Sequence, residues 1–501
     1  MSAFDGNRHE AGPRCRVVAP AALPFSTDLS AQPSRQSAAP PHLTVPDTLD
    51  AWIRREMERR HIPGLALAIV RAGEVVTTRA YGFADLQNQV PVNTATRFEL
   101  ASLTKAFTAA GIMLLVEDGK VDLDAPISEY LSDAPANWAG VTTRHLLYHT
   151  SGLPRIGEAF RSRTIPWPLD MSTKVVYEAA RGDTLSSRPG ATHTYSDVGY
   201  VLLGMITEKA SGTPWRDFVR SRILEPLGMK DSYVMDLEHI HRNEARGYTL
   251  RRGEVVNIRR VYQVELPSHA GIFSNLTDLT KWDAALYDNR LLREASLTST
   301  WTPARLIDGN VFPYGAGWFV SCQAGRPVHQ HTGLTGTEMV RFPADTLTVI
   351  VLTNLGGPSP EVDSWNLAPR IAEMMLPTLA VIRTPRALPN AVRDRVVGEY
   401  RLVTGGRRPN SAVRIGVDGG RMYFEMGGDR SPFTYLGNDT FMIDGEPGAV
   451  VLERGAAGRV DGWRVHGPET APTDGAVRTR ADCASVPAVG PLVARAVRVS
   501  K

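Results

Sequence analysis

The chain has 501 residues, of which 43% are hydrophobic and 22% are charged, an ordinary composition for a globular protein. At roughly 150 residues per domain, this length predicts more than one domain. Lys and Arg number 56 against 53 Asp and Glu, a formal net charge of +3. Because these charges form no basic run, the sequence gives no support for nucleic-acid binding. No apolar stretch approaches the ~18 residues that a membrane-spanning helix needs.

Residues 1–46 are expected to form a disordered N-terminal tail or a degenerate export signal. Arg14 and Arg16 precede apolar residues 17–25, but that segment is short and interrupted by proline, which makes a poor signal core. A run of Ser, Pro, Gln and Ala then extends to Pro41 and is typical of a linker. We favour the tail, and with it a cytoplasmic over a periplasmic or secreted location.

A helix and a hairpin are predicted directly after the tail. Residues 47–60 place apolar side chains on one stripe, with arginine and glutamate opposite, as in an amphipathic helix. Pro63 and Gly64 end this pattern. Residues 65–70 and 75–81 then favour two strands joined by a tight turn.

The next segment carries the strongest chemical signal. Ser102 lies where an apolar, charge-free helix would begin, so free backbone N–H groups and the positive end of the helix dipole lie beside it. Lys105 follows three residues later and shares the same face of the first turn. Serine is a weak nucleophile until a neighbour takes its proton, so the pair predicts a nucleophile with its activating amine. The alternative is that Ser102 caps the helix and Lys105 extends to solvent.

Two histidines, His145 and His149, have the four-residue spacing of a zinc pair on a helix. No glutamate follows the first histidine as a metalloprotease base would, and no third ligand is evident. We therefore interpret the segment as a structural helix and turn, and we expect neither a metal nor another cofactor.

A tyrosine, Tyr195, stands between the turn at Pro189-Gly190 and an apolar helix predicted over 198–209. It could be a core tyrosine with a satisfied hydroxyl, or a residue of the site. Asp197, two residues later, could cap that helix or pair with a lysine.

Further downstream, His331-Thr332-Gly333 precedes two strand-like runs at 339–342 and 347–353. A glycine on a strand lets a ligand approach the backbone closely, and an edge strand with a glycine bulge is the alternative.

From 391 to 467, short apolar runs alternate with glycine turns, which predicts a small all-β module. Residues 468–501 are expected to be a disordered or loosely packed C-terminal tail.

Three motifs in this order resemble the serine β-lactamase-like superfamily, which contains class C β-lactamases, penicillin-binding DD-peptidases, D-aminopeptidases and related esterases. Residues 96–105 resemble its nucleophile segment, with Ser-x-x-Lys. Tyr195-Ser196-Asp197 is similar to the Tyr-x-Asn motif, with aspartate in place of asparagine. His331-Thr332-Gly333 is similar to the third motif, Lys-Thr-Gly or His-x-Gly. The opening of the β module, 397–400, resembles the lipocalin-like domain appended to many members.

The resemblance implies a mixed α/β fold in which helices flank an antiparallel sheet, together with a helical subdomain and a small C-terminal β-barrel. It places the catalytic domain at 47–380, the lipocalin-like domain at 391–467 and a tail at 468–501.

It also implies acyl transfer through an acyl-enzyme. Ser102 would attack a carbonyl, and Lys105 and Tyr195 would take its proton and later return one to the leaving group. The N–H groups of Ser102 and Leu334 would hold the oxyanion. The expected substrate-binding residues are Asp197, His331, Gly333 and Leu334.

The expected partner is a small-molecule ester or amide. Carboxylester hydrolysis is the leading hypothesis, ahead of a D-amino-acid peptidase or amidase and of a β-lactamase. A histidine with an ordinary pKa of ~6.5 is mostly neutral at pH 7, so His331 disfavours carboxylate-bearing substrates. A catalytically idle protein that binds or assembles is the remaining alternative, and the complete motif set argues against it.

Overall fold

The structure is a computed structural model, and the part described below covers most of the sequence with several gaps. Its residues are 43–154, 172–236, 238–258, 267–357, 362, 364–379, 386–405, 412–426, 429–437, 439–443, 449–454, 460–466 and 492–498. Most of the expected N-terminal tail, 1–46, lies outside these residues.

An antiparallel sheet of seven strands forms the centre of the catalytic region, in the order β11-β12-β13-β14-β1-β2-β3. The expected N-terminal hairpin is present, because β1 and β2 pair across the turn at Ala72-Gly73, where both residues have positive φ. The strands of this sheet are β1 Gly64–Arg71, β2 Glu74–Asp85, β3 Val90–Pro91, β11 Phe319–Gln323, β12 Arg326–Thr332, β13 Glu338–Phe342 and β14 Leu347–Thr353.

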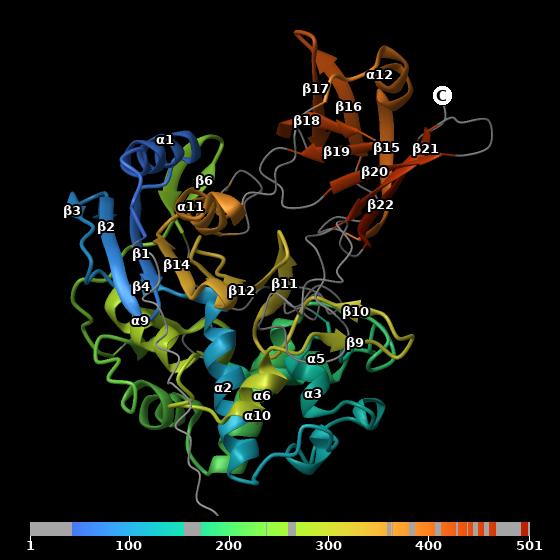
Figure 1. The fold of residues 1–501 in the computed structure, drawn as a ribbon. Helices are drawn as coiled ribbons and strands as arrows, with labels where there is room; N and C mark the ends of the chain where they lie inside the picture. Colours follow the sequence, from blue (N-terminus) through green and yellow to red (C-terminus); the bar gives the residue numbers. More distant parts are fainter. Residues whose placement is uncertain are drawn as a thin grey trace, which may run out of the picture. The chain divides into compact units, whose positions relative to one another are not determined.

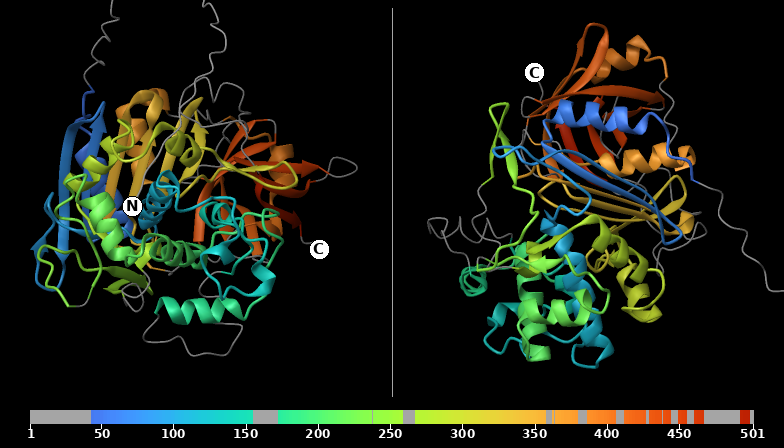
Figure 2. Two further views of the ribbon diagram at one scale, coloured as in Figure 1. Left: turned by 90° about the horizontal axis from the view of Figure 1, so that it is seen from below. Right: turned by 90° about the vertical axis from the view of Figure 1, so that its left-hand side faces the viewer.

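Helices cover both faces of this sheet (Figures 1 and 2). Alternate side chains of a strand point to opposite faces, so Leu65 and Leu67 of β1 pack with α1 (Leu49–Arg60) and α11 (Leu367–Met375). On the other face, Ala66 and Ala68 join the core around α2 (Thr104–Glu117), and α9 (Leu276–Ala285) also contacts β1.

A helical region surrounds α2, which is buried from Thr104 to Leu115 because its residues, apart from Lys105, are apolar or small on every side. Phe107 of α2 stacks on Trp282 of α9, with ring centroids 4.2 Å apart. The other α-helices of this region are α3 Thr143–Leu147, α5 Thr173–Arg181, α6 Asp197–Ser211, α7 Trp215–Val219, α8 Pro267–Ala270 and α10 Glu294–Thr300.

Short elements connect the sheet and the helices. The strands β4 Phe98–Glu99, β8 Ile272–Ser274 and β5 Tyr233–Val234 form a three-stranded sheet. Two hairpins pair β6 Tyr248–Arg251 with β7 Glu254–Asn257, and β9 Ala304–Arg305 with β10 Val311–Phe312. Short helical turns are η1 Ala101–Leu103, η2 Ile127–Glu129, η3 Ala136–Trp138, η4 Arg220–Leu224, η5 Pro343–Asp345 and η6 Pro377–Leu379.

The C-terminal region is a closed barrel preceded by α12 (Asn390–Val396), and the expected small all-β barrel is thus confirmed. The expected tail at 468–501 is wrong for residues 492–498, because they form β22, which pairs with both β15 and β21. The barrel strands are β15 Gly398–Gly405, β16 Ala412–Asp418, β17 Arg421–Met426, β18 Asp429–Gly437, β19 Thr440–Ile443, β20 Ala449–Arg454, β21 Val460–His466 and β22 Leu492–Arg498.

The fold of the catalytic region therefore agrees with the expected mixed α/β architecture. Among the described residues, no helix combines the length and the apolar character that crossing a bilayer requires.

A buried ion pair ties α9 to the sheet. The Arg341 guanidinium lies 2.7 Å from a carboxylate oxygen of Asp283, and each side chain is only 1% exposed. The Thr348 hydroxyl donates to the same carboxylate at 2.9 Å. The guanidinium also lies over Tyr287, 4.3 Å from the ring centroid. Asp283 thus neutralises the charge of Arg341 at a position that water does not reach.

We expect Asp283→Leu to lower the free energy of unfolding by about 3–5 kcal/mol, because it leaves Arg341 as an uncompensated buried charge. Denaturant unfolding of the catalytic region measures the loss. The double variant Asp283→Leu/Arg341→Met should be more stable than Asp283→Leu alone. Equal stability of the two variants would contradict the role given to the pair.

Candidate active site

The candidate nucleophile lies in a strained turn. Ser102 is in η1, directly before α2, and the preceding Ala101 has a φ of 45°. For a non-glycine residue, this left-handed conformation costs about 1–2 kcal/mol, so surrounding contacts must hold the turn in place. Strain of this kind is typical of functional turns. The prediction that Ser102 stands at the start of the apolar helix therefore agrees with the structure.

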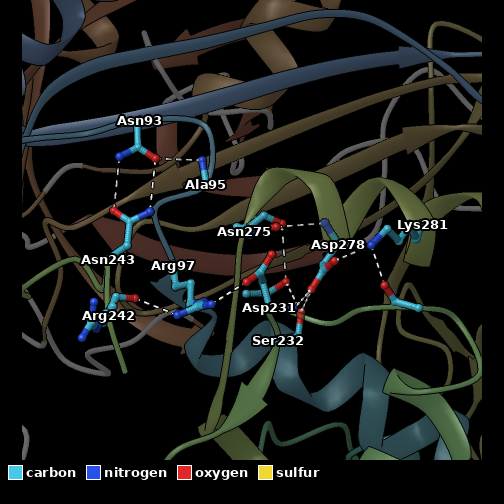
Figure 3. Close-up of polar contacts among 12 residues, drawn as sticks. Asn93, Ala95, Arg97, Asp231, Ser232, Arg242, Asn243, Asn275, Asp278 and Lys281 are labelled. Atoms are coloured by element: carbon cyan, nitrogen blue, oxygen red, sulfur yellow. Dashed lines mark hydrogen bonds and ion pairs between the residues drawn. The ribbon is translucent and has the colours of Figure 1, made fainter. Parts of the chain in front are cut away.

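A polar network holds the strand that leads into this turn (Figure 3). Arg97 donates to the carbonyl of Arg242 at 2.7 Å and forms an ion pair with Asp231. The backbone N–H of Asp231 donates in turn to the Asp278 carboxylate at 2.7 Å, and Lys281 pairs with that carboxylate at 2.8 Å. These contacts tie β4 to β5 and α9 and so position the segment that ends at Ser102.

The second predicted residue, Lys105, is fully buried, with a side-chain exposure of 0%. Its ammonium nitrogen lies 3.2 Å from Ser102 Oγ, 2.8 Å from Asp197 Oδ1 and 3.0 Å from the carbonyl oxygen of His269. Three acceptors match the three donors of a lysine ammonium. The nitrogen also lies 4.9 Å from the ring centroid of Tyr195. The alternative of a lysine that extends to solvent is therefore wrong.

The position of Asp197 distinguishes its two expected roles. The cap of α6 is Ser196, whose side chain accepts the N–H of Gly199 at 3.3 Å. Asp197 is instead the first residue of α6 and forms the ion pair with Lys105. The capping role considered for Asp197 is therefore wrong, and its carboxylate belongs to the polar centre around Lys105.

Charge within this centre controls its protonation. Burial lowers the pKa of Lys105, but Asp197 and Tyr195 together outweigh this effect, and the net result is a raised pKa. Burial also raises the pKa of the Tyr195 phenol; the Lys105 charge opposes this shift, and the Asp197 charge reinforces it. At neutral pH the resting pair is therefore an ammonium and a phenol. One proton must leave the pair before either group can act as a base, and the apparent pKa of that step belongs to the pair.

The loop after β12 lies against the nucleophile turn. The hydroxyls of Thr335 and Thr337 both donate to the carbonyl of Glu99, at 2.8 and 3.1 Å. Gly333 comes so close that a Cβ there would lie 2.3 Å from the carbonyl oxygen of Leu100. The sequence predicts that Gly333 makes room for a substrate, but the carbonyl of Leu100 already requires a glycine here.

Two backbone N–H groups at this junction have no acceptor among the described residues, those of Ser102 and Leu334. They are the two donors that the motif resemblance assigns to an oxyanion hole. Unused N–H groups on two segments in contact can stabilise a developing negative charge. The side chain of Leu334 is 41% exposed beside them.

The histidine of the third motif, His331, is buried behind the site, with 1% of its surface exposed. Nδ1 lies 2.8 Å from the carbonyl oxygen of Thr332, and Nε2 lies 3.1 Å from the hydroxyl of Tyr314. These partners assign the proton to Nδ1 and let Nε2 accept from the phenol. Burial, reinforced by the Lys105 charge, lowers the pKa of His331 to about 3. The imidazole is therefore neutral at physiological pH.

The two histidines with zinc spacing serve different structural roles. Nδ1 of His145 accepts the backbone N–H of Thr142 at 3.2 Å and completes the capping box of α3. Nδ1 of His149 accepts the N–H of Ser196 at 3.1 Å, and its ring packs on Tyr195 with centroids 4.2 Å apart. The described residues contain no group of three or more ligating side chains suited to a metal ion. His149 is thus a support of Tyr195 that the sequence pattern did not reveal.

Comparison with known proteins agrees with this geometry. The family model described as Beta-lactamase matches residues 49–373, well over half of the chain. The chain belongs to the beta-lactamase family. It is a serine hydrolase, in keeping with the penicillin-binding protein and the D-amino acid amidase to which it is similar.

Three proteins illustrate what this chain is similar to within the family. Penicillin-binding protein 4* of Bacillus subtilis is 30% identical over 396 residues, which are 74% of this chain and 85% of that protein. The D-amino acid amidase of Ochrobactrum anthropi is 28% identical, with a TM-score of 0.55 over 67% of this chain and 99% of the other. The octameric penicillin-binding protein homologue of Pyrococcus abyssi, 24% identical, has a TM-score of 0.59 over 90% and 99% of the two chains and shows the common fold.

We expect Ser102→Ala to lose nearly all hydrolysis, by about 10⁶ in kcat, because loss of a nucleophile removes the acyl-enzyme route. Steady-state kinetics measure the loss, and an unchanged thermal unfolding midpoint serves as the control for folding. Turnover near that of the wild type would refute Ser102 as the nucleophile.

The Asp197 carboxylate should set the pH at which the base becomes available. Its negative charge raises the pKa of both Lys105 and Tyr195, so Asp197→Asn should lower the pKa of the pair. The deprotonated, active form then appears at lower pH, and the rising limb of the kcat/KM profile should move toward acid while turnover persists.

Asp124→Asn is the matched control, because Asp124 pairs with Arg144 away from the site, at 2.7 Å. Its pH profile should equal that of the wild type. If Asp197→Asn also left the profile unchanged and lowered only thermal stability, the proposed electrostatic role would be wrong.

Proposed function

We propose that this serine hydrolase is a carboxylester hydrolase that acts on neutral esters. Once the Lys105–Tyr195 pair has lost one proton, Ser102 attacks the ester carbonyl and passes its own proton to that pair. The N–H groups of Ser102 and Leu334 stabilise the oxyanion. The pair returns a proton to the departing alcohol, and water then hydrolyses the acyl-enzyme by the same steps in reverse order.

The observation that carries this proposal is the neutral, buried state of His331. A carboxylate on a substrate would gain from a fixed cation at this position, where the related motif has lysine. His331 has a pKa of about 3 and both ring nitrogens occupied, so it offers no charge. The nearby cation, Lys105, is already paired with Asp197. The substrates that suit this electrostatic environment are therefore uncharged near the reacting carbonyl.

The side chains around the centre are also suited to an apolar substrate. Tyr314 meets Phe319 edge-on, with ring centroids 4.8 Å apart, and Phe319 lies 5.5 Å from His331. Tyr195 lies 6.2 Å from Tyr314. Tyr314 is fully buried, but Phe319 and Tyr195 are partly exposed, and aromatic rings favour hydrocarbon parts of a ligand over a carboxylate.

A D-amino-acid amide is the second candidate substrate. The D-amino acid amidase of Ochrobactrum anthropi, at 28% identity over nearly its whole length, favours this option. Like an ester, such an amide presents no carboxylate at the reacting end. A β-lactam carries one, which places β-lactamase activity third.

We expect kcat/KM on short-chain p-nitrophenyl esters to exceed that on nitrocefin by roughly ten- to a hundredfold. The reason is the missing charge-assisted hydrogen bond to the carboxylate, worth about 1.5–3 kcal/mol. A parallel screen with D-amino-acid p-nitroanilides decides between ester and amide.

Ser102→Ala, assayed on every substrate, shows which turnover arises at this site. Nitrocefin turnover equal to or above that of the esters would overturn the ester assignment. Turnover of the anilides above that of the esters would select the amidase instead.

A further inference from the structure

The carbonyl of Gly333 accepts two hydrogen bonds. The backbone N–H of Gly336 donates to it at 3.0 Å, and the indole Nε1–H of Trp365 donates to it at 2.8 Å. Trp365 lies 32 residues further along the chain, so this bond is a tertiary contact between the loop after β12 and the segment before α11.

This carbonyl belongs to the same peptide unit as the N–H of Leu334. A donor at the oxygen of an amide withdraws electron density from the whole unit and makes its N–H a stronger donor, as in hydrogen-bond chains. We propose that Trp365 is a positioning residue of the oxyanion hole, which orients and polarises the Gly333–Leu334 peptide. This inference rests on the proposed function, because it needs the Leu334 N–H to meet the oxyanion.

The rest of the Gly333–Leu334 region is fixed by backbone contacts. The N–H of Gly333 donates to the carbonyl of Thr337 at 2.7 Å, and the carbonyl of Leu334 accepts the N–H of Gly357 at 2.9 Å. The N–H of Leu334 is left without an acceptor among the described residues. These bonds fix the two peptide units on either side, while the unused N–H of the Gly333–Leu334 unit is strengthened through its own carbonyl.

Trp365 itself is held firmly on both sides. Its carbonyl accepts from the Arg60 guanidinium at 2.5 Å, and Arg60 is paired with Glu56 at 2.8 Å. On the other side, the buried carboxylate of Glu338 accepts the N–H groups of Leu367 and Ala368 at the start of α11, at 3.0 and 3.2 Å. The indole donor thus has little freedom to move, and a preorganised dipole needs no rearrangement during the reaction.

The test is Trp365→Phe, which keeps an aromatic ring and removes the donor. We expect kcat/KM on a neutral p-nitrophenyl ester to fall about three- to tenfold, less than the ~10²–10³ that follows loss of an oxyanion donor itself. The effect should appear in kcat with KM within about twofold of the wild type, because the oxyanion forms only in the transition state. The affinity for an alkylboronic acid, whose tetrahedral adduct with Ser102 places an oxygen in the hole, should fall by the same factor.

Trp138→Phe is the matched control, because Trp138 is buried and its indole N–H has no acceptor in the described part of the chain. It should leave kcat and boronate affinity unchanged. A second pair, Trp365→His and Trp365→Leu, has similar side-chain volumes but only the histidine retains a donor. The histidine variant should exceed the leucine variant by the same three- to tenfold, and this pair carries the test if Trp365→Phe does not fold.

The inference is overturned if Trp365→Phe changes only the unfolding midpoint, or if the histidine and leucine variants are equal in kcat and boronate affinity. Failure of the proposed function gives a different result, because the wild type would then hydrolyse none of the esters while the boronate could still bind.

Discussion

The structure depends on the burial of one ammonium group. Lys105 is withdrawn from water, and a buried charge is tolerated only where oppositely charged and polar partners replace the lost hydration. Those partners come from three separate segments: the Ser102 turn, Asp197 at the start of α6, and the carbonyl of His269 in α8. The packing of α6 and α8 on α2 is thus coupled to the charge state of one side chain, and the same contacts bring the candidate nucleophile and base together.

Local patterns predicted the parts of the site that lie close in sequence. Ser102 and Lys105 are one helical turn apart, so their proximity follows from helix geometry alone. The order of the motifs further predicted that Tyr195 and Asp197 would lie near them. Trp365 had no such signal, because its contact with Gly333 depends on how α11 packs on the sheet. The barrel shows the same limit: β22 lies well beyond β21 in the sequence, and only its pairing with β15 and β21 shows that it belongs to the barrel.

The site combines an ion pair, Lys105–Asp197, with a neutral histidine, His331. The Lys105–Asp197 pair has no net charge, and the neutral imidazole of His331 beside it adds none. Under the proposed function, a substrate would meet oriented dipoles, mainly backbone N–H groups, instead of a fixed ion. Dipoles held in place stabilise charge that develops at the carbonyl during reaction and give little to charge already present on the ligand, so selection favours the transition state.

The first and last strands of the barrel, β15 and β22, pair with each other, so every strand has a hydrogen-bonded neighbour on both sides. A chain that stopped after His466 would retain β15 to β21 and lose one strand, but it would expose two edges, on β15 and on β21. Exposed edges pair readily with other chains. The strand β22 therefore closes the barrel, and a version of this protein without it would gain a tendency to self-associate through the exposed edges.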